Sequence, residues 1–229
     1  MRDSTAMKAV CDRREGIAGQ TGRRGVTFAA QVIAKRLMDV TAAAALLALL
    51  SPLFLVVAVL VKTTSRGTVF YRWLVVGKNG RYFTGYKFRT MVDNADRLKR
   101  DLLAHNEMSG PVFKMEADPR ITHMGRILRR FSLDELPQLW SVLKGDMSLV
   151  GPRPPLQEEY EHFSEWQKQK LGVQPGITCL WQVSGRNRIR DFDDWVRLDI
   201  QYIENWSLWL DVKILFRTAF AVVTGRGAS

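Results

Sequence analysis

Two adjacent carboxylates, Asp134 and Glu135, are the side chains in this sequence best suited to chemistry. A carboxylate can act as a nucleophile toward phosphorus or as a metal ligand, and two adjacent ones allow one of each. Phosphoryl transfer also needs positioned cations that neutralise the phosphate oxygens. The basic residues that could supply this charge are Lys87, Arg89, Arg129 and Arg153. Because the chain also has a long apolar segment, these residues indicate phosphoryl chemistry at a membrane face.

The same acids have a structural explanation that needs no catalysis. Ser132 and Glu135 have the S-x-x-E spacing of a capping box, in which a hydroxyl and a carboxylate satisfy free amides at a helix start. If Asp134 is the cap instead, Pro137 falls in the first turn, where its missing N–H costs little. Taken alone, this short stretch is better explained by capping than by catalysis.

The loop Gly151-Pro152-Arg153-Pro154 holds one arginine between two prolines. Its stiffness reduces the entropy that is lost when the guanidinium is fixed against a phosphate. The alternative is a rigid turn with an exposed arginine, and the loop alone does not separate the two.

The composition favours an anionic partner. The 229-residue chain has a formal net charge of +11, which suits nucleic acid, an anionic leaflet or a phosphorylated substrate. No zinc finger, RNA-binding aromatic motif or basic zipper is present, so nucleic acid is not expected as a partner. His105, His123 and His162 lie far apart, and Cys11 and Cys179 lack metal-site spacing. Walker A, dinucleotide-binding and G-x-S-x-G motifs are absent as well.

The apolar run from Val40 to Val61 carries no charge and would be about 33 Å long as a helix, which is enough to cross a bilayer. Ser51-Pro52 in its middle predicts a kink. Both flanks are basic, and the positive-inside rule draws both to the cytoplasmic side. A re-entrant helix satisfies both flanks, and a kinked spanning helix is the alternative. We therefore expect a disordered basic tail, a re-entrant membrane helix and a catalytic domain, over residues 1–30, 31–63 and 64–229.

The remaining pattern predicts a mostly helical α+β domain that positions the candidate residues. Two β-prone runs flank Gly77-Lys78-Asn79-Gly80, which is typical of a hairpin turn. Residues 92–105 and 156–171 have helical periodicity. Residues 177–183 form a short β-prone stretch.

The C-terminal region, residues 193–223, predicts a long helix with a break near Asn205. Its tryptophans, Trp195, Trp206 and Trp209, are typical of amphipathic helices at a membrane interface. Ordinary core packing explains each of them equally well.

Taken together, these motifs resemble the monotopic phosphoglycosyl transferases, also called the bacterial sugar transferase family. Each short block is a weak signal, but several in the right order are highly specific. In chain order, the blocks are the apolar segment with Ser51-Pro52, Tyr86–Met91, Asp118–Thr122, Leu128–Arg130, Ser132–Gln138, Lys144–Ser148 and Gly151–Pro154. Residues Trp181–Asn187 further resemble the branch that primes exopolysaccharide synthesis with a hexose phosphate.

The resemblance implies transfer of a hexose-1-phosphate from UDP-glucose or UDP-galactose to undecaprenyl phosphate, with release of UMP. This step would begin exopolysaccharide or capsule synthesis on the cytoplasmic face of a bacterial inner membrane. The implied cofactor is Mg²⁺, and membrane lipids are further partners. A homo-oligomer is left open. The alternatives are a transferase for a different UDP-sugar and a non-catalytic basic membrane adaptor.

The resemblance also implies roles for individual residues. Asp134 would attack the β-phosphorus and form a covalent phosphosugar intermediate. Glu135 would support it, by binding the metal with Asp134 or by assisting the polyprenyl phosphate. Ser51-Pro52 would form the membrane kink. The residues that would bind phosphate or substrate are Lys87, Arg89, Asp118, Arg120, Arg129, Arg153 and Arg186.

Overall fold

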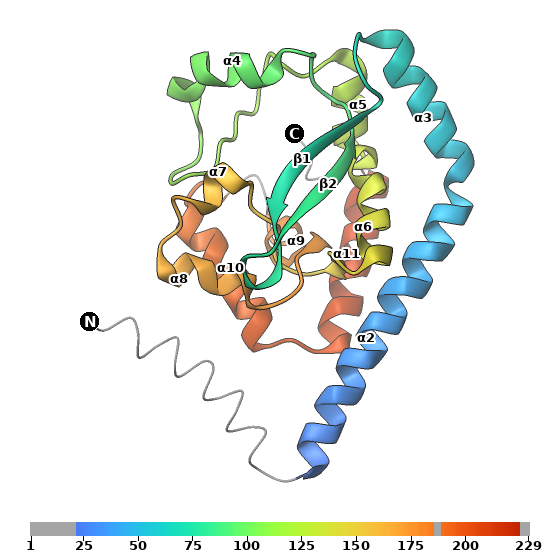
Figure 1. The fold of residues 1–229 in the computed structure, drawn as a ribbon, viewed down its shortest axis with the longest axis vertical. Coiled ribbons are helices and arrows are strands. Elements are labelled where there is room, and N and C mark those ends of the chain that lie inside the picture. Colours follow the sequence, from blue (N-terminus) through green and yellow to red (C-terminus); the bar gives the residue numbers. More distant parts are fainter. Residues whose placement is uncertain (1–21, 186–188, 225–229) are drawn as a thin grey trace.

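The computed structural model has the predicted fold class, a mostly helical α+β arrangement with two small sheets (Figure 1). The structure describes residues 22–185 and 189–224, with side chains from residue 28 onward. Helix α2 (Gly22–Leu49) begins inside the segment expected as a tail, so residue 31 is not a boundary between elements. Residues 1–21 of that segment lie outside the described residues.

Helices α2 and α3 (Ser51–Thr64) form one rod along the side of the molecule, bent by 62° (Figure 1). The break between the two helices is Leu50, directly before Ser51-Pro52, where the sequence predicts a kink. Pro52 occupies the first turn of α3, where its missing N–H needs no helical partner. Within the described residues no single helix is long and apolar enough to cross a membrane, whereas the two arms together meet that criterion by length and composition alone.

Strands β1 (Phe70–Val76) and β2 (Tyr82–Phe88) confirm the predicted antiparallel hairpin. The turn η1 (Lys78–Gly80) closes it, with Asn79 in the left-handed region at φ 56°. Trp73 lies opposite Gly85, and a side chain on Gly85 would come within 2.9 Å of the indole ring. Gly85 therefore makes room for Trp73 over β2.

Short helices follow the hairpin, and in chain order they are α4 (Ala95–Asp101), η2 (Leu103–His105), α5 (His123–Arg130), η3 (Leu133–Gln138) and α6 (Leu139–Lys144). The first two confirm most of the helix predicted for residues 92–105. Thr122 caps α5, because its hydroxyl accepts a hydrogen bond from the Gly125 amide at 2.9 Å. Helix η3 carries both acids and leads directly into α6.

Strand β3 (Ser148–Val150) pairs in parallel with β4 (Gly176–Thr178). The segments around β4 are α7 (Gln157–Tyr160), α8 (Glu165–Lys168), η4 (Gln169–Gly172) and α9 (Leu180–Val183). The helical periodicity of residues 156–171 is therefore divided among α7, α8 and η4, because Ser164 starts a new helix through a capping box with Gln167. The β-prone stretch at residues 177–183 gives way to helix at Leu180.

Helices α10 (Phe192–Glu204) and α11 (Leu208–Thr224) confirm the predicted C-terminal helix with a break at Asn205. Trp195 is only 3% exposed, so the membrane-interface interpretation is wrong for this residue. Trp209 on α11 is 64% exposed and keeps that interpretation open.

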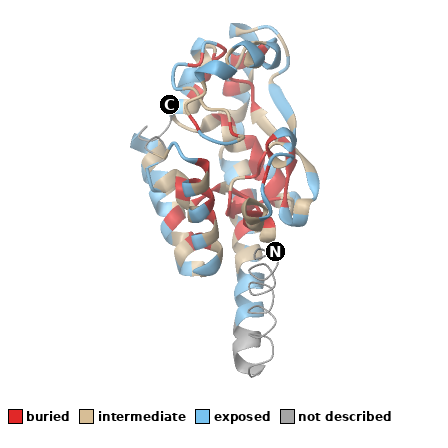
Figure 2. Ribbon diagram, turned by 90° about the vertical axis from the view of Figure 1, so that its left-hand side faces the viewer, coloured by how far each residue is buried: buried red, intermediate tan, exposed pale blue. Residues whose placement is uncertain are grey.

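The interior consists of buried clusters between these helices (Figure 2). Val142 and Ile214 belong to a core shared by α2, α6 and α11. Trp181 and Trp195 stack at a centroid distance of 3.9 Å in a second core around α9 and α10. Phe88 is buried between α3 and α5 in a third core. The bent rod is thus packed against the domain through both of its arms.

A buried polar cluster also joins α2 to the domain. Lys35 Nζ lies 2.6 Å from Asp211 Oδ2 and donates to the carbonyl of Val150 at 3.0 Å. Tyr202 donates its hydroxyl to Asp211 Oδ1 at 2.7 Å, and Trp206 donates to Oδ2 at 3.2 Å. Burial and the neighbouring Asp211 raise the pKa of Tyr202, so this phenol stays protonated as a donor.

Candidate active site

A left-handed residue turns the chain into the two acids. Ser132 follows α5 at φ 52° and ψ 23°, and η3 then carries Asp134 and Glu135. The predicted capping box is wrong, because an N-cap needs an extended backbone and Ser132 makes no capping hydrogen bond through its side chain. Asp134 lies inside η3, so it is not the cap either. Its side chain is buried, with only 6% of the residue exposed, and Glu135 is half-buried.

Lys87 of β2 lies beside the dyad. Its Nζ is 2.7 Å from Glu135 Oε1 and 5.3 Å from the centroid of the Trp73 ring. Both charged side chains are mostly shielded from solvent, at 23% and 16% exposure, so salt screens this pair less than a surface pair. The contact joins two of the predicted site residues that are 48 positions apart in the chain.

Arg129 is oriented by the end of the hairpin. Its Nε donates to the hydroxyl of Thr90 at 3.0 Å. The carbonyl of Thr90 accepts from the Thr122 amide at 3.0 Å, which fixes the start of α5 to the same residue. Gly125 permits this close approach, since a Cβ there would overlap the Thr90 carbonyl oxygen. Because α5 also packs against η3, this joint between Thr90 and the start of α5 positions Arg129 relative to the acids.

Asp118 and Arg120 form a buried ion pair in the loop before α5. Arg120 Nη2 donates to Asp118 Oδ2 at 2.7 Å, and Nε donates to Oδ1 at 2.9 Å. Burial alone would raise the pKa of the Asp118 carboxyl. The hydrogen bonds and charge of Arg120, together with the charge of Arg129, outweigh burial and hold that pKa below its ordinary value. Asp118 and Arg120 thus neutralise each other inside the protein, close enough to Arg129 for its charge to act on Asp118.

The other predicted phosphate ligands make contacts elsewhere. Arg89 donates to the carbonyl and hydroxyl of Ser65 at 2.8 and 2.9 Å, which ties it to the end of α3. The guanidinium of Arg153 lies 5.5 Å from the centroid of the Trp195 ring on α10. Arg186 lies outside the described residues. The role of these arginines in phosphate binding stays a prediction.

The Gly-Pro-Arg-Pro loop is held against β4. Gly151 donates its amide to the Thr178 carbonyl at 3.0 Å, and the Pro152 carbonyl accepts from Gly176 at 3.0 Å. Cys179 lies next to this contact, and burial raises the pKa of its thiol to about 12. The thiol is therefore protonated at neutral pH and is not a nucleophile.

Asp134 and Glu135 offer two carboxylates to a divalent cation. Across residues 22–185 and 189–224, no group of three or more Asp, Glu, His or Cys side chains is arranged to hold a metal. Mg²⁺ is commonly bound by only one or two carboxylates, with substrate phosphates and water supplying further oxygens. The donor set therefore fits a Mg²⁺ that binds together with a phosphorylated substrate.

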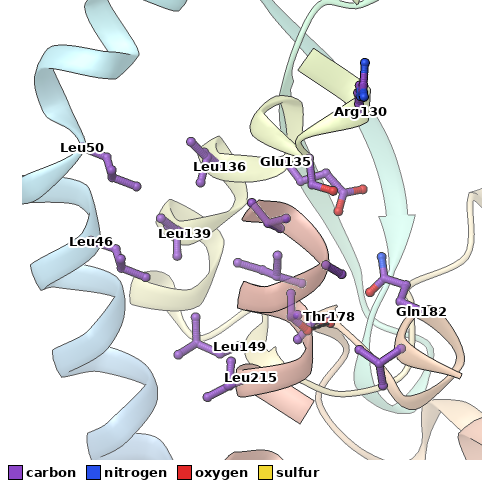
Figure 3. A pocket seen from close by; sticks show the side chains of 16 residues that line it. Leu46, Leu50, Arg130, Glu135, Leu136, Leu139, Leu149, Thr178, Gln182 and Leu215 are labelled. Carbon is purple, nitrogen blue, oxygen red and sulfur yellow. Dashed lines mark hydrogen bonds between the residues drawn. The ribbon is translucent and has the colours of Figure 1, made fainter. Parts of the chain in front are cut away.

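An apolar cavity of about 220 Å³ opens beside the acids (Figure 3). Leu46 and Leu50 of the bent rod line one wall, and Leu215 of α11 lines another. Glu135 and Arg130 lie at one end of it, as Figure 3 shows. Glu135 therefore contacts Lys87 and also borders this apolar space.

The family of the chain follows from a comparison with known proteins. The family model for "Bacterial sugar transferase" matches residues 30–225, which include the bent rod, the acids and the cavity. The chain belongs to the bacterial sugar transferase family. The resemblance drawn from the short motifs is thereby confirmed.

Proteins similar to this bacterial sugar transferase have names that state an activity or a biosynthetic process. The chain is 50% identical to the galactosyl transferase CpsE of Streptococcus agalactiae, over 86% of this chain and 44% of the relative. It is 43% identical to the exopolysaccharide production protein ExoY of Rhizobium meliloti, over 86% and 88%. It is 44% identical to the undecaprenyl-phosphate galactose phosphotransferase of Salmonella typhimurium, over 85% and 41%. The chain thus spans less than half of the first and third relatives and most of ExoY.

Several residues of this family member shape the site although the sequence did not single them out. They are Trp73, Thr90, Thr122 and Gly125. Thr90 and Thr122 lie in the Tyr86–Met91 and Asp118–Thr122 blocks, where only the charged residues were assigned a role. Gly125 could not be recognised by its chemistry, because its role is to leave room for the Thr90 carbonyl oxygen.

Proposed function

We propose that this bacterial sugar transferase moves a hexose-1-phosphate from a UDP-hexose to undecaprenyl phosphate and releases UMP. UDP-glucose and UDP-galactose are the proposed donors. The observation that carries the proposal is a buried aspartate, Asp134, next to a glutamate that is ion-paired with Lys87 and lines an apolar cavity. The name of the Salmonella relative, an undecaprenyl-phosphate galactose phosphotransferase, supports the same substrate class.

The first half-reaction uses Asp134 as the nucleophile. A carboxylate oxygen attacks the β-phosphorus, and the bond from this phosphorus to the bridging oxygen breaks. UMP leaves with that oxygen, and the hexose phosphate stays on Asp134 as an acyl phosphate. Burial of Asp134 removes competing water from the carboxylate.

The second half-reaction returns the enzyme to its starting state. A phosphate oxygen of undecaprenyl phosphate attacks the same phosphorus and displaces the Asp134 carboxylate. The product is undecaprenyl-diphospho-hexose. Both steps move a phosphoryl centre between oxygens, so the catalytic demand is positioning and neutralisation of negative charge.

Lys87 and Arg129 supply fixed positive charge for both steps. Lys87 is held between Glu135 and Trp73, and Arg129 is oriented by Thr90. Fixed cations need no reorganisation when charge develops on the phosphate oxygens. Held by Asp134, Glu135 and the substrate phosphates, Mg²⁺ would add further neutralisation of this charge.

The proposed location is the cytoplasmic face of a bacterial inner membrane, with the bent rod re-entering one leaflet. Large apolar side chains are exposed on both arms of the rod and on α11, including Ile33, Leu37, Leu55, Trp209 and Phe216. Exposed apolar surface of this kind marks contact with a membrane or a partner. Basic residues flank the apolar run Val40–Val61 within the rod, and the positive-inside rule draws both of its ends to the cytoplasmic side.

Turnover of purified protein in detergent tests this proposal. UMP release is measured with UDP-glucose or UDP-galactose, Mg²⁺ and undecaprenyl phosphate. Without acceptor, the intact mass of the protein should rise by one hexose phosphate. Asp134→Asn should abolish both signals while Asp101→Asn, at an exposed position, should leave them unchanged.

Two results would contradict the proposal. Normal turnover by the Asp134→Asn variant would exclude this residue as the nucleophile. Failure of the wild-type protein to release UMP from any UDP-sugar would support a non-catalytic membrane adaptor instead.

A further inference from the structure

The cavity beside the acids has two ends of different chemistry (Figure 3). Glu135 and the exposed cation Arg130 line one end. The rest is mainly aliphatic, with side chains from Leu46, Leu50, Leu139, Leu149, Leu215 and Val222. A ligand that matches both ends has an anionic head and a hydrocarbon chain.

Helix α11 presents apolar side chains in two directions. Leu215, Thr218 and Val222 recur at helical spacing and line the cavity. Phe216 and Phe220 point away from it and are 73% and 63% exposed. The cavity is therefore a separate apolar surface from the exposed stripe that the proposed function assigns to the membrane.

The wall formed by Leu46 and Leu50 links the cavity to the bent rod. On the outer side of the same rod, Leu49 and Leu55 are 74% and 68% exposed. Leu46 of the cavity wall is itself 38% exposed, so the rod carries apolar side chains both at the cavity and on its outer side.

The size of the cavity limits what it can hold. At about 220 Å³, it is smaller than the roughly 300–1,000 Å³ of pockets that enclose a drug-sized ligand. Thr178 and Thr218, with hydroxyls 2.7 Å apart, join β4 to α11 along its lining. The space suits a short length of one chain and does not suit the paired acyl chains of a phospholipid.

We infer that this cavity binds the isoprenoid units nearest the phosphate of the polyprenyl phosphate acceptor. Arg130 lies beside the acceptor phosphate, and the leucines of α2 and α11 cover the first isoprenoid units. The inference rests on the proposed function and adds to it a position for the acceptor. It also explains why an apolar space adjoins the charged side chains of Glu135 and Arg130.

A matched pair of substitutions on α11 tests the inference. Ala221 lines the cavity, whereas Ala219 is exposed on the other face of the same helix. Ala221→Phe should raise the KM for undecaprenyl phosphate about tenfold, which corresponds to one or two methylenes excluded from the cavity. Ala219→Phe should leave this KM unchanged.

The first half-reaction, which needs only the UDP-hexose, distinguishes a failure of the acceptor site from a failure of the proposed function. Formation of the hexose-phosphate adduct without acceptor reports on folding and on the acids, so Ala221→Phe should match the wild type there. An unchanged acceptor KM in Ala221→Phe, with normal adduct formation, would overturn the acceptor site and leave the proposed function intact. Absence of adduct in the wild type would overturn the proposed function.

Photolabelling gives a readout that does not depend on turnover. A short polyprenyl phosphate with a benzophenone near the phosphate should label peptides from η3 or α11, and excess undecaprenyl phosphate should suppress the labelling. Equal suppression by phosphatidylglycerol would assign the cavity to a membrane phospholipid and would contradict the inference. Labelling confined to β1 or α4 would contradict it as well.

Discussion

At the scale of single residues, the site combines one buried acid with charges that are already paired. Glu135 is bound by Lys87, and Asp118 is bound by Arg120. Such pairs hold charges in fixed positions, because neither partner can leave without exposing the other as an unmatched charge. The proposed nucleophile, Asp134, therefore lies next to a glutamate whose position is fixed before substrate arrives.

Replacing Lys87 should reduce turnover strongly. Lys87→Gln removes the cation beside Glu135 and one fixed charge for the phosphate oxygens, so kcat/KM for the UDP-hexose should fall about 100-fold. Steady-state UMP release measures it. The matched control is Lys99→Gln, which breaks the more exposed pair with Glu158 and should leave turnover unchanged. Similar losses in both variants would argue against a site-specific role for Lys87.

The Asp118–Arg120 pair should make stability depend on pH in the acid range. The pKa of Asp118 is lower in the folded than in the unfolded protein, so its contribution is present above the unfolded pKa, about 3.9, and is lost as pH falls through the folded value. Asp118→Asn should lower the free energy of unfolding at pH 7 by about 3 kcal/mol, because it leaves Arg120 buried without its charge partner.

Denaturant unfolding in detergent at pH 7 and at pH 3 measures this effect. The difference between wild type and Asp118→Asn should shrink at the lower pH. The exposed substitution Asp101→Asn serves as the reference and should show no difference at either pH. A difference that stays constant with pH would mean that Asp118 contributes through packing and not through its charge.

At the scale of elements, the sequence predicted the turns and breaks that depend only on neighbouring residues. Asn79-Gly80 predicted the hairpin, and Asn205 marked the break between α10 and α11. The parallel pairing of β3 with β4 joins residues far apart in the sequence, so no local signal could reveal it. Trp195 was ambiguous for the same reason, since its burial depends on stacking with Trp181.

The candidate site was predictable to a similar extent. The adjacent acids and the motif blocks predicted that Asp134, Glu135 and Lys87 lie together, and the structure brings Lys87 into contact with Glu135. The sequence could not show that Ser132 adopts a left-handed backbone, which replaces the expected cap by a turn. It also could not show that Arg89 contacts Ser65 at the end of α3, because that contact depends on how the rod packs.

The joint between α5 and the hairpin should be sensitive to one methyl group. Gly125→Ala places a Cβ against the Thr90 carbonyl oxygen, so α5 must shift and the bond from Arg129 to Thr90 should weaken. We expect a loss of stability of about 1–3 kcal/mol and a lower kcat. Thermal unfolding and UMP release measure the two effects.

Gly172→Ala is the control for this substitution, because a Cβ there meets nothing within 4 Å. It should leave both stability and kcat close to wild type. A Gly125→Ala variant with normal kcat would show that Arg129 does not depend on this joint for its position.

At the scale of the whole molecule, the polar cluster around Asp211 attaches the bent rod to the domain. Asp211 accepts hydrogen bonds from Lys35, Tyr202 and Trp206, and Lys35 also contacts the strand that precedes the Gly-Pro-Arg-Pro loop. The orientation of the rod is therefore coupled to the segment that leads into this loop.

Asp211→Asn should loosen this attachment. The substitution leaves Lys35 without its charge partner, so the free energy of unfolding should fall by about 3 kcal/mol. Denaturant unfolding in detergent measures the loss. Asp194→Asn breaks an exposed pair with Arg197 and should change stability by less than about 1 kcal/mol. Equal stability of the two variants would mean that the cluster does not anchor α2.

The attachment of both arms of the rod has a consequence for the surrounding lipid. Arg36 fixes α2 to the carbonyls of Val142 and Leu143 on α6, while Val57 and Val61 bury α3 against the third core. The 62° angle therefore cannot open without breaking one of these contacts. In the proposed attachment, the two helices therefore enter one leaflet at a fixed angle. Any hydrophobic mismatch must then be taken up by thinning or thickening of the bilayer, at a cost of fractions of a kcal/mol per Å.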